Sequence, residues 1–288
     1  MMKKLMETLT ADRDHWVGDG FPVRSLFSYH PNAAAVSPFL LFDYAGPYNF
    51  APNIGEPRGV GRHPHRGFET VTIVYDGEVS HKDSEGGGGT IGAGDVQWMT
   101  AAGGILHEEY HSKVFSRTGG PFRMVQLWVN LPAKDKMSRP KYQAILSAEI
   151  PVVTFAGGKA RIIAGAFGKT RGPASTFTPI NIWDVRLDAG ANVALDIPEG
   201  HNALLSVLSG RVRIDGTEIG AAEVARLSAD GAGAVVETLE ETVLLVLTGE
   251  PIDEPVVGQG PFVMNTEGEI RQAFDDFKRG KFGLAASA

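Results

Sequence analysis

The segment IGAGDV at residues 91–96 reappears as IGAAEV at residues 219–224, in the other half of the chain. Upstream of each copy runs an apolar stretch, residues 69–77 and residues 202–210, and both stretches end in glycine. Short segments rich in alanine and glycine match easily by chance, but here two matches follow each other in the same order. This order favours a duplicated domain and predicts an architecture of two similar units in tandem.

Strand and turn signals dominate most of the sequence. The 288 residues include 36 glycines and 17 prolines, which suit many tight turns, and 43% of the residues are apolar, enough for two cores. The β-branched stretch from Thr70 to Tyr75 ends in Asp76-Gly77, a hairpin-turn pair. We expect further strands at residues 91–99, 124–130, 180–187, 203–208, 212–214, 224–227 and 242–247. The expected fold class is therefore all-β, with two tandem antiparallel barrels of jelly-roll type.

The last part of the chain departs from this pattern and predicts one amphipathic helix. Asn265-Thr266 precede Glu269 as in a capping box, apolar residues recur at helical spacing between residues 270 and 277, and Gly280 provides a stop. Residues 131–143 are polar, contain proline and lack periodicity, so we expect a connection between domains there. The expected domains are residues 1–135 and residues 136–288, with the terminal helix in the second.

Composition and charge exclude several classes of protein. The net charge of −7 and the isoelectric point near 5.6 argue against direct nucleic-acid binding, which needs clustered lysine and arginine. The chain has no cysteine, so disulfides and thiolate metal sites are excluded. Residues 1–10 are not followed by a signal-peptide apolar run, and no apolar stretch is long enough for a membrane span. We expect a cytoplasmic protein, and any metal must bind imidazole and carboxylate.

Two pairs of potential metal ligands stand at strand-like positions. His63-Pro64-His65 opens the first strong strand, and in an extended chain residues i and i+2 point to the same face. His107-Glu108-Glu109 repeats this spacing. A lone pair of this kind is usually a solvated surface feature, but three of the eight histidines fall into these two pairs. On neighbouring strands the four side chains would surround one point, and three imidazoles with one carboxylate suit a divalent transition metal.

The sequence around both pairs resembles the motifs of a known family. The stretch RHPHRGFETV at residues 62–71 resembles the first metal-binding motif of the pirin family, and GDVQWMTA at 94–101, followed by GILHEE at 104–109, resembles the second. Further similar stretches at residues 126–132, 140–143, 264–266 and 282–283 extend the resemblance over most of the chain. The resemblance implies a bicupin of the cupin superfamily, in which the N-terminal cupin binds one metal ion.

The resemblance also implies which residues hold the metal: His63, His65, His107 and Glu109. Iron is the metal that we expect, with nickel, manganese, copper, cobalt or zinc as alternatives. In cupins at large the carboxylate ligand follows the first histidine pair, and the residue at that position here is Glu69. We prefer Glu109. Glu69, which the spacing puts on the face of His65, is then a neighbour of the ligands, or a base that turns towards the metal.

The second half offers a poor transition-metal site in the register of the duplication. The residues opposite the four ligands are Asp196, Pro198, Val235 and Glu237. Only Glu109 keeps a carboxylate at its counterpart, so we expect the C-terminal domain to be metal-free. His81 and His111 are expected beside the site rather than on the metal. His201 is expected at the surface or in a turn, and Trp98 and Trp128 are expected in the core.

Four protein ligands leave about two positions open on a six-coordinate metal, so dioxygen and an organic chelate can bind side by side. The pirin family includes quercetin 2,3-dioxygenases. The resemblance therefore implies a non-haem oxidoreductase, in which Glu69 or Glu109 accepts a proton from a flavonol-like substrate. Two alternatives stay open: a redox-sensitive regulatory module that acts through a protein partner, and a structural zinc site. The sequence does not fix the physiological substrate, the metal in cells or the oligomeric state.

Overall fold

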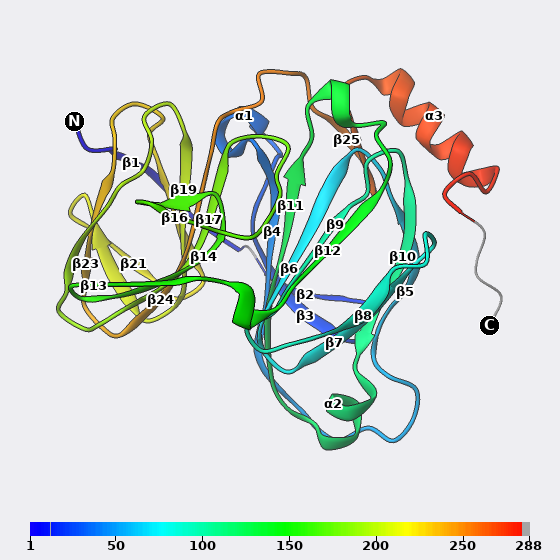
Figure 1. The fold of residues 1–288 in the computed structure, drawn as a ribbon, viewed down its shortest axis with the longest axis horizontal. Helices are drawn as coiled ribbons and strands as arrows, with labels where there is room; N and C mark the ends of the chain where they lie inside the picture. The colour runs from blue at the N-terminus through cyan, green and yellow to red at the C-terminus, as the bar shows by residue number, and fades with distance from the viewer. Residues whose placement is uncertain (12, 284–288) are drawn as a thin grey trace. The chain divides into compact units, whose positions relative to one another are not determined.

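The computed structural model describes residues 1–11 and 13–283 (Figure 1). The described chain forms two compact units, each assembled from three segments. Unit I comprises Asp14–Arg24, Phe42–Ser147 and the chain from Asp253 on, and unit II comprises Met1–Arg13, Ser25–Leu41 and Ala148–Ile252. No helix in the described part of the chain is long and apolar enough to cross a membrane.

Unit I is built around one seven-stranded and one four-stranded antiparallel sheet. The strands of the larger sheet, in spatial order, are β12 (Lys141–Ile145), β9 (Val96–Thr100), β6 (Phe68–Asp76), β11 (Gly120–Asn130), β4 (Phe39–Phe50), β3 (Phe21–Ser28) and β2 (Asp14–Val17). Two strands of this larger sheet, β3 and β4, have their residues 25–28 and 39–41 in unit II. Those of the smaller sheet are β5 (Gly59–His65), β10 (Ile105–His111), β7 (Glu78–Asp83) and β8 (Gly88–Gly92). The strands that carry the two ligand pairs, β5 and β10, are therefore neighbours.

Unit II repeats this plan. Its larger sheet has the order β1 (Leu5–Thr10), β22 (Glu223–Leu227), β19 (Asn202–Ser209), β24 (Thr242–Gly249), β17 (Ile180–Leu187), β14 (Gly158–Ala164) and β13 (Val152–Phe155). Its smaller sheet has the order β18 (Asn192–Leu195), β23 (Ala234–Thr238), β20 (Arg211–Ile214) and β21 (Thr217–Gly220), and a short ribbon pairs β15 (Ala166–Phe167) with β16 (Thr170–Arg171). The repeated segment joins β8 to β9 in unit I and β21 to β22 in unit II. The predicted all-β jelly-roll duplication is confirmed.

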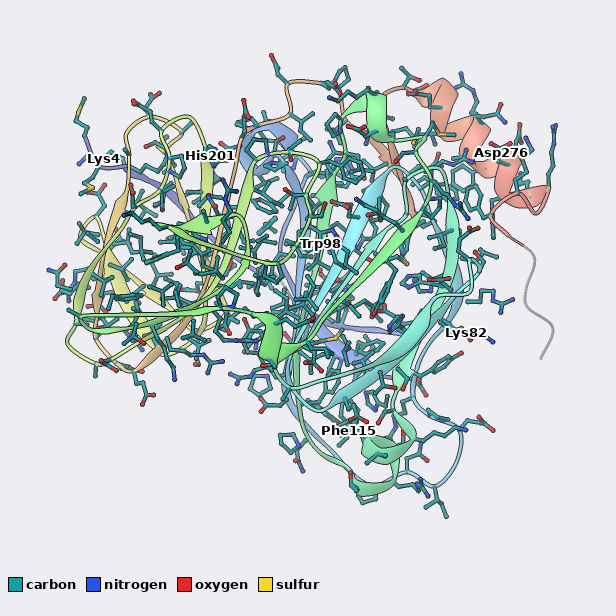
Figure 2. All side chains as sticks on the ribbon, in the orientation of Figure 1. Lys4, Lys82, Trp98, Phe115, His201 and Asp276 are labelled. Atoms are coloured by element: carbon teal, nitrogen blue, oxygen red, sulfur yellow. The ribbon has the colours of Figure 1, made fainter. Side chains whose placement is uncertain are left out.

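The interiors of the two units differ in polarity. In unit II, side chains from both sheets form one apolar core that includes Trp183, Leu205, Val236 and Val246. In unit I, an apolar cluster that includes Phe21, Phe50 and Phe122 fills only part of the interior. Side chains pack densely between the strands of each unit (Figure 2). The remaining interior of unit I holds the histidines and carboxylates of the predicted site.

The helices are few, and the last one follows the prediction. The shorter helices are α1 (Ala33–Val36), α2 (Lys113–Thr118) and the 3-10 turns Ala133–Asp135 and Ser147–Glu149. In α3 (Glu267–Lys278), Thr266 caps the N-terminus by accepting a hydrogen bond from the Glu269 backbone, and Gly280 follows the C-terminus with φ of +72°. Its buried face packs against the hairpin of β25 (Val257–Gln259) and β26 (Phe262–Met264).

Three local expectations differ from the structure. The strand expected over residues 91–99 is two strands, because Gly94 adopts φ of +90° in a turn between them. The expected connection at residues 131–143 contains a 3-10 turn and the start of β12, and the N-terminal part of the chain, which gave no strand signal, forms β1 to β4. The domain boundary at residues 135 and 136 stays a prediction, since units that are compact in space need not coincide with domains in sequence.

Candidate metal centre

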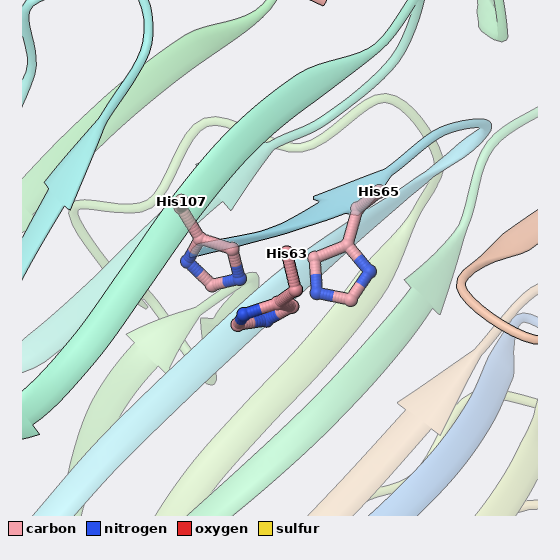
Figure 3. Close-up of side chains that lie close together, drawn as sticks. All are labelled: His63, His65 and His107. Carbon is pink, nitrogen blue, oxygen red and sulfur yellow. The ribbon is translucent and has the colours of Figure 1, made fainter. Parts of the chain in front are cut away.

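Three imidazoles meet inside unit I. His63 and His65 lie on β5 and His107 lies on the adjacent β10, where the antiparallel register places it directly opposite His63. Each of the three rings offers a nitrogen, and these nitrogens all lie within 4.8 Å of one another. Figure 3 shows the rings converging from their strands, and the ring centroids are 4.2 to 4.9 Å apart. The predicted convergence of the histidines is thus what the structure shows.

The surroundings of these rings keep them neutral and leave nitrogens without partners. Burial lowers the pKa of His65 to about 3 and holds the pKa of His107 well below its ordinary value. Neither ring nitrogen of His107 nor Nδ1 of His65 has a hydrogen-bond partner, although all three atoms are buried. An unsatisfied buried polar atom costs about 1–3 kcal/mol, and a bound cation would remove that cost. Neutral imidazoles with free lone pairs fit a divalent metal.

The tautomer of His63 is fixed by the backbone. Its Nδ1 lies 2.9 Å from the Gly61 carbonyl oxygen, which can only accept a hydrogen bond. Nδ1 therefore carries the proton, and Nε2 is left with its lone pair. A backbone carbonyl that orients an imidazole in this way is a common companion of metal-binding histidines.

Glu109 lies beside the three imidazoles. It follows His107 by two residues on β10, so both side chains face the interior, and it is 6% exposed. The Thr72 hydroxyl lies 3.4 Å from its Oε1, and burial raises the pKa of Glu109 to about 7. Its carboxylate is not one of the atoms that lie within 4.8 Å of one another. Its role as the fourth ligand is therefore a proposal.

Glu69 faces away from the imidazoles. Side chains alternate along β6, and Glu69 is three residues before Thr72, whose hydroxyl faces Glu109. The two positions therefore belong to opposite faces of the sheet. Glu69 is buried, and its carboxylate accepts a hydrogen bond of 2.6 Å from the Thr100 hydroxyl on β9.

The expectation that Glu69 shares a face with His65 is wrong. It assumed one continuous strand, but β5 ends at His65 and β6 begins at Phe68. Gly67, between them, has φ of +91°, a conformation outside the strand region that resets the alternation of side chains. Of the two carboxylates considered, the geometry favours Glu109.

A cavity of about 330 Å³ opens beside the imidazoles. Its lining is mostly apolar, with a few polar groups: Val17, Phe21, Val23, Asp43, Val60, His63, His65, Glu109, Met124, Gln126 and Trp128. Trp128, expected in the core, instead forms a wall of the cavity, stacking on Phe68 at 4.2 Å and meeting His65 edge-on at 5.5 Å. Sequence reasoning missed Asp43 and Gln126, because only the pairing of distant strands brings them to the site. Such a cavity is typical of a small-molecule site.

Three further histidines, His81, His111 and His201, have partners outside the three-imidazole group. His111 Nε2 donates to the Gly20 carbonyl at 2.9 Å, and the ring packs among the phenylalanines of the apolar cluster. His81 Nε2 lies 2.6 Å from the Tyr142 hydroxyl. His201, in unit II, lies 3.4 Å from the Thr248 hydroxyl.

In unit II, the residues predicted to correspond to the four ligands are in the wrong register. Val235 is 39% exposed, and Glu237 accepts a hydrogen bond from Arg213 at 3.0 Å, so neither points inward. Asp196 and Pro198 lie beyond the end of β18. The inward-facing residues of β18 and β23 are Val193, Leu195, Ala234, Val236 and Thr238, none of them a usual ligand of a transition metal. The alignment was displaced by one residue in β23, and a one-residue shift exchanges the two faces of a strand. That this unit binds no metal stays a prediction.

Comparisons with known proteins agree with this fold. The family model described as Pirin matches residues 20–129, and that of the Pirin C-terminal cupin domain matches residues 182–283. A Pseudomonas aeruginosa protein provisionally named a quercetin 2,3-dioxygenase is 55% identical over 283 residues, covering 98% of this chain and 99% of that protein. A pirin-like protein of Caulobacter vibrioides is 40% identical over 255 residues, covering 88% of this chain and 90% of that protein.

Solved structures of similar proteins have the same fold. A crystal structure of a quercetin 2,3-dioxygenase from Acinetobacter baumannii has a TM-score of 0.95 at 54% identity, covering 98% of this chain and 99% of that one. A bacterial pirin from Escherichia coli in complex with nickel(II) has a TM-score of 0.65 at 20% identity, covering 85% of this chain and 99% of that one, and so shares the fold. With both family models matched and relatives aligned over nearly its whole length, the chain belongs to the pirin family.

Proposed function

We propose that unit I holds one divalent metal ion on His63, His65, His107 and Glu109, and that the protein is a quercetin 2,3-dioxygenase. The proposal is carried by three neutral imidazoles, two of them buried and that of His63 half-buried, which converge beside a largely apolar cavity of about 330 Å³. A structural metal site needs no such cavity, because its ligands close around the ion. The names of the relatives from Pseudomonas and Acinetobacter support the same activity.

The residues that line the cavity would have separate roles in such a reaction. Bound iron(II) would supply a Lewis acid and a redox centre. The aromatic side chains of Trp128 and Phe21, both in the lining, would contact a flat flavonol, and the apolar lining would exclude bulk water. Asp43 and Gln126 offer polar atoms to the hydroxyl groups of the substrate. Together these groups would orient the flavonol heterocycle towards the imidazoles.

Glu109 would accept the proton of the flavonol 3-hydroxyl. Glu109 lines the cavity and lies on the same strand as His107. Burial raises the pKa of Glu109 to about 7, and a bound cation would favour its ionised form, which is the form that accepts a proton. In the overall reaction one dioxygen is consumed for each flavonol. The two ring bonds of carbon 3 and the O–O bond break, and carbon 3 leaves with its own oxygen as carbon monoxide. The two oxygen atoms of dioxygen form new bonds to carbons 2 and 4 and remain in the ring-opened ester.

Anaerobic binding followed by exposure to air tests the proposal. Quercetin added to the iron(II)-loaded protein under argon should shift its absorption band, and the metal-free protein should give no shift. Admitting air should then bleach the band over many turnovers, with equal amounts of oxygen consumed and carbon monoxide released. The His107→Ala variant should lose both effects, whereas His201→Ala in unit II should keep both.

Each alternative function has its own outcome in this experiment. A closed structural zinc site would give neither the shift nor turnover. A shift without turnover across several flavonols would favour a regulatory module that acts through a protein partner. Metal present without any binding of quercetin would contradict the quercetin 2,3-dioxygenase assignment.

A further inference from the structure

A buried arginine ties the metal-bearing strands to the terminal helix. Arg66 directly follows His65 and is 4% exposed. Its Nε donates to the Gly103 carbonyl at 2.7 Å, two residues before β10 begins, and its Nη1 donates to Asp276 on α3 at 3.0 Å. Figure 2 shows the position of Asp276 on the helix. One guanidinium therefore connects the end of β5, the approach to β10 and α3.

The residues after α3 also contact Arg66 and the backbone that precedes β10. The Phe282 ring lies under the Arg66 guanidinium, with 4.5 Å from its carbon to the ring centroid. A Cβ added to Gly104 would lie 2.5 Å from this ring, so the ring rests on the backbone just before β10. The Phe282 carbonyl accepts from the Ser84 hydroxyl at 2.6 Å, and that hydroxyl oxygen accepts from the Leu106 backbone at 3.1 Å. Leu106 is the neighbour of His107.

The turn between β5 and β6 is held by β26 and by Lys136. The Val263 backbone on β26 donates to the Arg66 carbonyl at 3.0 Å, and a Cβ on Gly67 would lie 1.9 Å from the Val263 carbonyl oxygen. Glycine is thus required for this approach. The Lys136 ammonium donates to the carbonyls of Gly67 and Val263 at 2.7 and 3.2 Å. The backbone next to His65 is fixed on β26.

We propose that residues 262–283 form a C-terminal clamp, in which Arg66 and Asp276 are positioning residues that keep His65 and His107 at metal-binding spacing and slow the loss of metal. The inference rests on the metal centre proposed above. Ligand nitrogens must be held to within about 0.5 Å for tight binding, and such precision comes from the residues that support them. Here those supports come from the terminal helix and the residues that flank it.

Two neighbouring aspartates on α3 provide a matched comparison. Asp276 is 6% exposed and bonds to Gln272 and Lys281 at 2.8 Å each, in addition to Arg66. Asp275 is exposed. Replacing Asp276 with alanine leaves Arg66 without its buried counter-charge, while the same change at Asp275 removes a solvated carboxylate.

Nickel(II) is a suitable probe, because a pirin with this fold has been crystallised with it. The full-length protein and its variants are loaded with nickel(II), mixed with excess EDTA, desalted at intervals and analysed for bound nickel. Loss of nickel should be about 10- to 100-fold faster in Asp276→Ala and Phe282→Ala than in the wild type, the effect typical of residues that support ligands. Asp275→Ala should match the wild type. Phe282→Leu, which keeps an apolar side chain, should fold and release nickel at an intermediate rate.

Two controls separate the clamp from general stability and from the metal centre itself. Val212→Ala weakens the core of unit II, and with a similar fall in melting temperature it should still release nickel at the wild-type rate. Equal release from Val212→Ala and Asp276→Ala would overturn the clamp, as would wild-type release from Asp276→Ala and Phe282→Leu. A wild-type protein that binds no nickel would instead contradict the metal centre.

Discussion

At the scale of single residues, two buried glutamates of unit I differ in what they face. Burial raises the pKa of both Glu109 and Glu69 to about 7. Glu109 lines the cavity that His63 and His65 also line, where a bound cation would favour its ionised form. Glu69 points to the opposite face of the sheet and bonds to Thr100. Their exchange for glutamine therefore has different consequences.

The first prediction separates these two carboxylates. Glu109→Gln replaces an anionic oxygen donor with a neutral amide, so metal retention against a competing chelator should fall by about tenfold or more. Glu69→Gln keeps an oxygen that can accept from Thr100, and its metal content should equal that of the wild type. Elemental analysis after dialysis measures both. Metal lost only from Glu69→Gln would contradict this prediction and make Glu69 the carboxylate ligand, as in cupins at large.

The second prediction concerns Lys136, whose ammonium is buried against the Asn130 side chain and two carbonyls. Burial lowers the pKa of Lys136 from 10.5 to about 7. Between these values the unfolded chain binds more protons than the folded one, so the penalty of burying the charge disappears as pH rises. The free energy of unfolding of the wild type, relative to Lys136→Met, should therefore increase from pH 7 to pH 10. Urea denaturation across that range measures it, and a flat or falling difference would contradict the prediction.

Single residues also show what sequence reasoning can and cannot reach. The i, i+2 spacing within His63-Pro64-His65 was enough to pair two imidazoles, because both lie on one uninterrupted strand. The same reasoning failed for Glu69, because Gly67 breaks the alternation. Nothing in a single sequence says whether a glycine lies inside a strand or ends it.

At the scale of elements, local signals predicted more than distant ones. The bounds of α3 follow from Thr266, Glu269 and Gly280, which act within the helix and its ends. The strand expected at residues 180–187 coincides with β17, since its apolar run is bounded clearly. Strands β2 and β3 gave no signal, because their partners are fixed by pairing across the sheet. The cavity walls that they supply therefore stayed unpredicted.

The third prediction tests the local origin of α3. The Thr266 hydroxyl accepts from the Glu269 backbone at 3.2 Å, and losing such a cap costs about 1 kcal/mol. Thr266→Ala should lower the free energy of unfolding by that amount, and Thr266→Asp should restore most of it. Glu267→Ala removes only an exposed pair with Arg271 and should change little. Urea denaturation distinguishes these outcomes, and an equal loss in all three variants would exclude a capping role.

At the scale of the whole molecule, two units share one sheet order but not one interior chemistry. The duplication was visible in the sequence because the turn segments at 91–96 and 219–224 kept their glycines and alanines. The alignment of β10 with β23 could not be read from the sequence, because loops of different length separate β9 from β10 and β22 from β23. The sequence therefore predicted a site in the N-terminal half, but it misassigned the residues of the C-terminal half that occupy the corresponding positions.

The last prediction is the number of metal ions in each chain. Burying an ion among apolar side chains without ligands is strongly unfavourable. The positions of β18 and β23 that face inward in unit II carry aliphatic groups and Thr238, whose hydroxyl is bonded to the backbone of Asp188 and Ala191. In unit I, by contrast, buried imidazole nitrogens have no partner until a cation supplies one. Elemental analysis of the reconstituted protein should therefore give about one ion per chain. Metal should be lost from His63→Ala and His107→Ala and kept by His201→Ala, and two ions per chain, or full loading of His107→Ala, would contradict a single site in unit I.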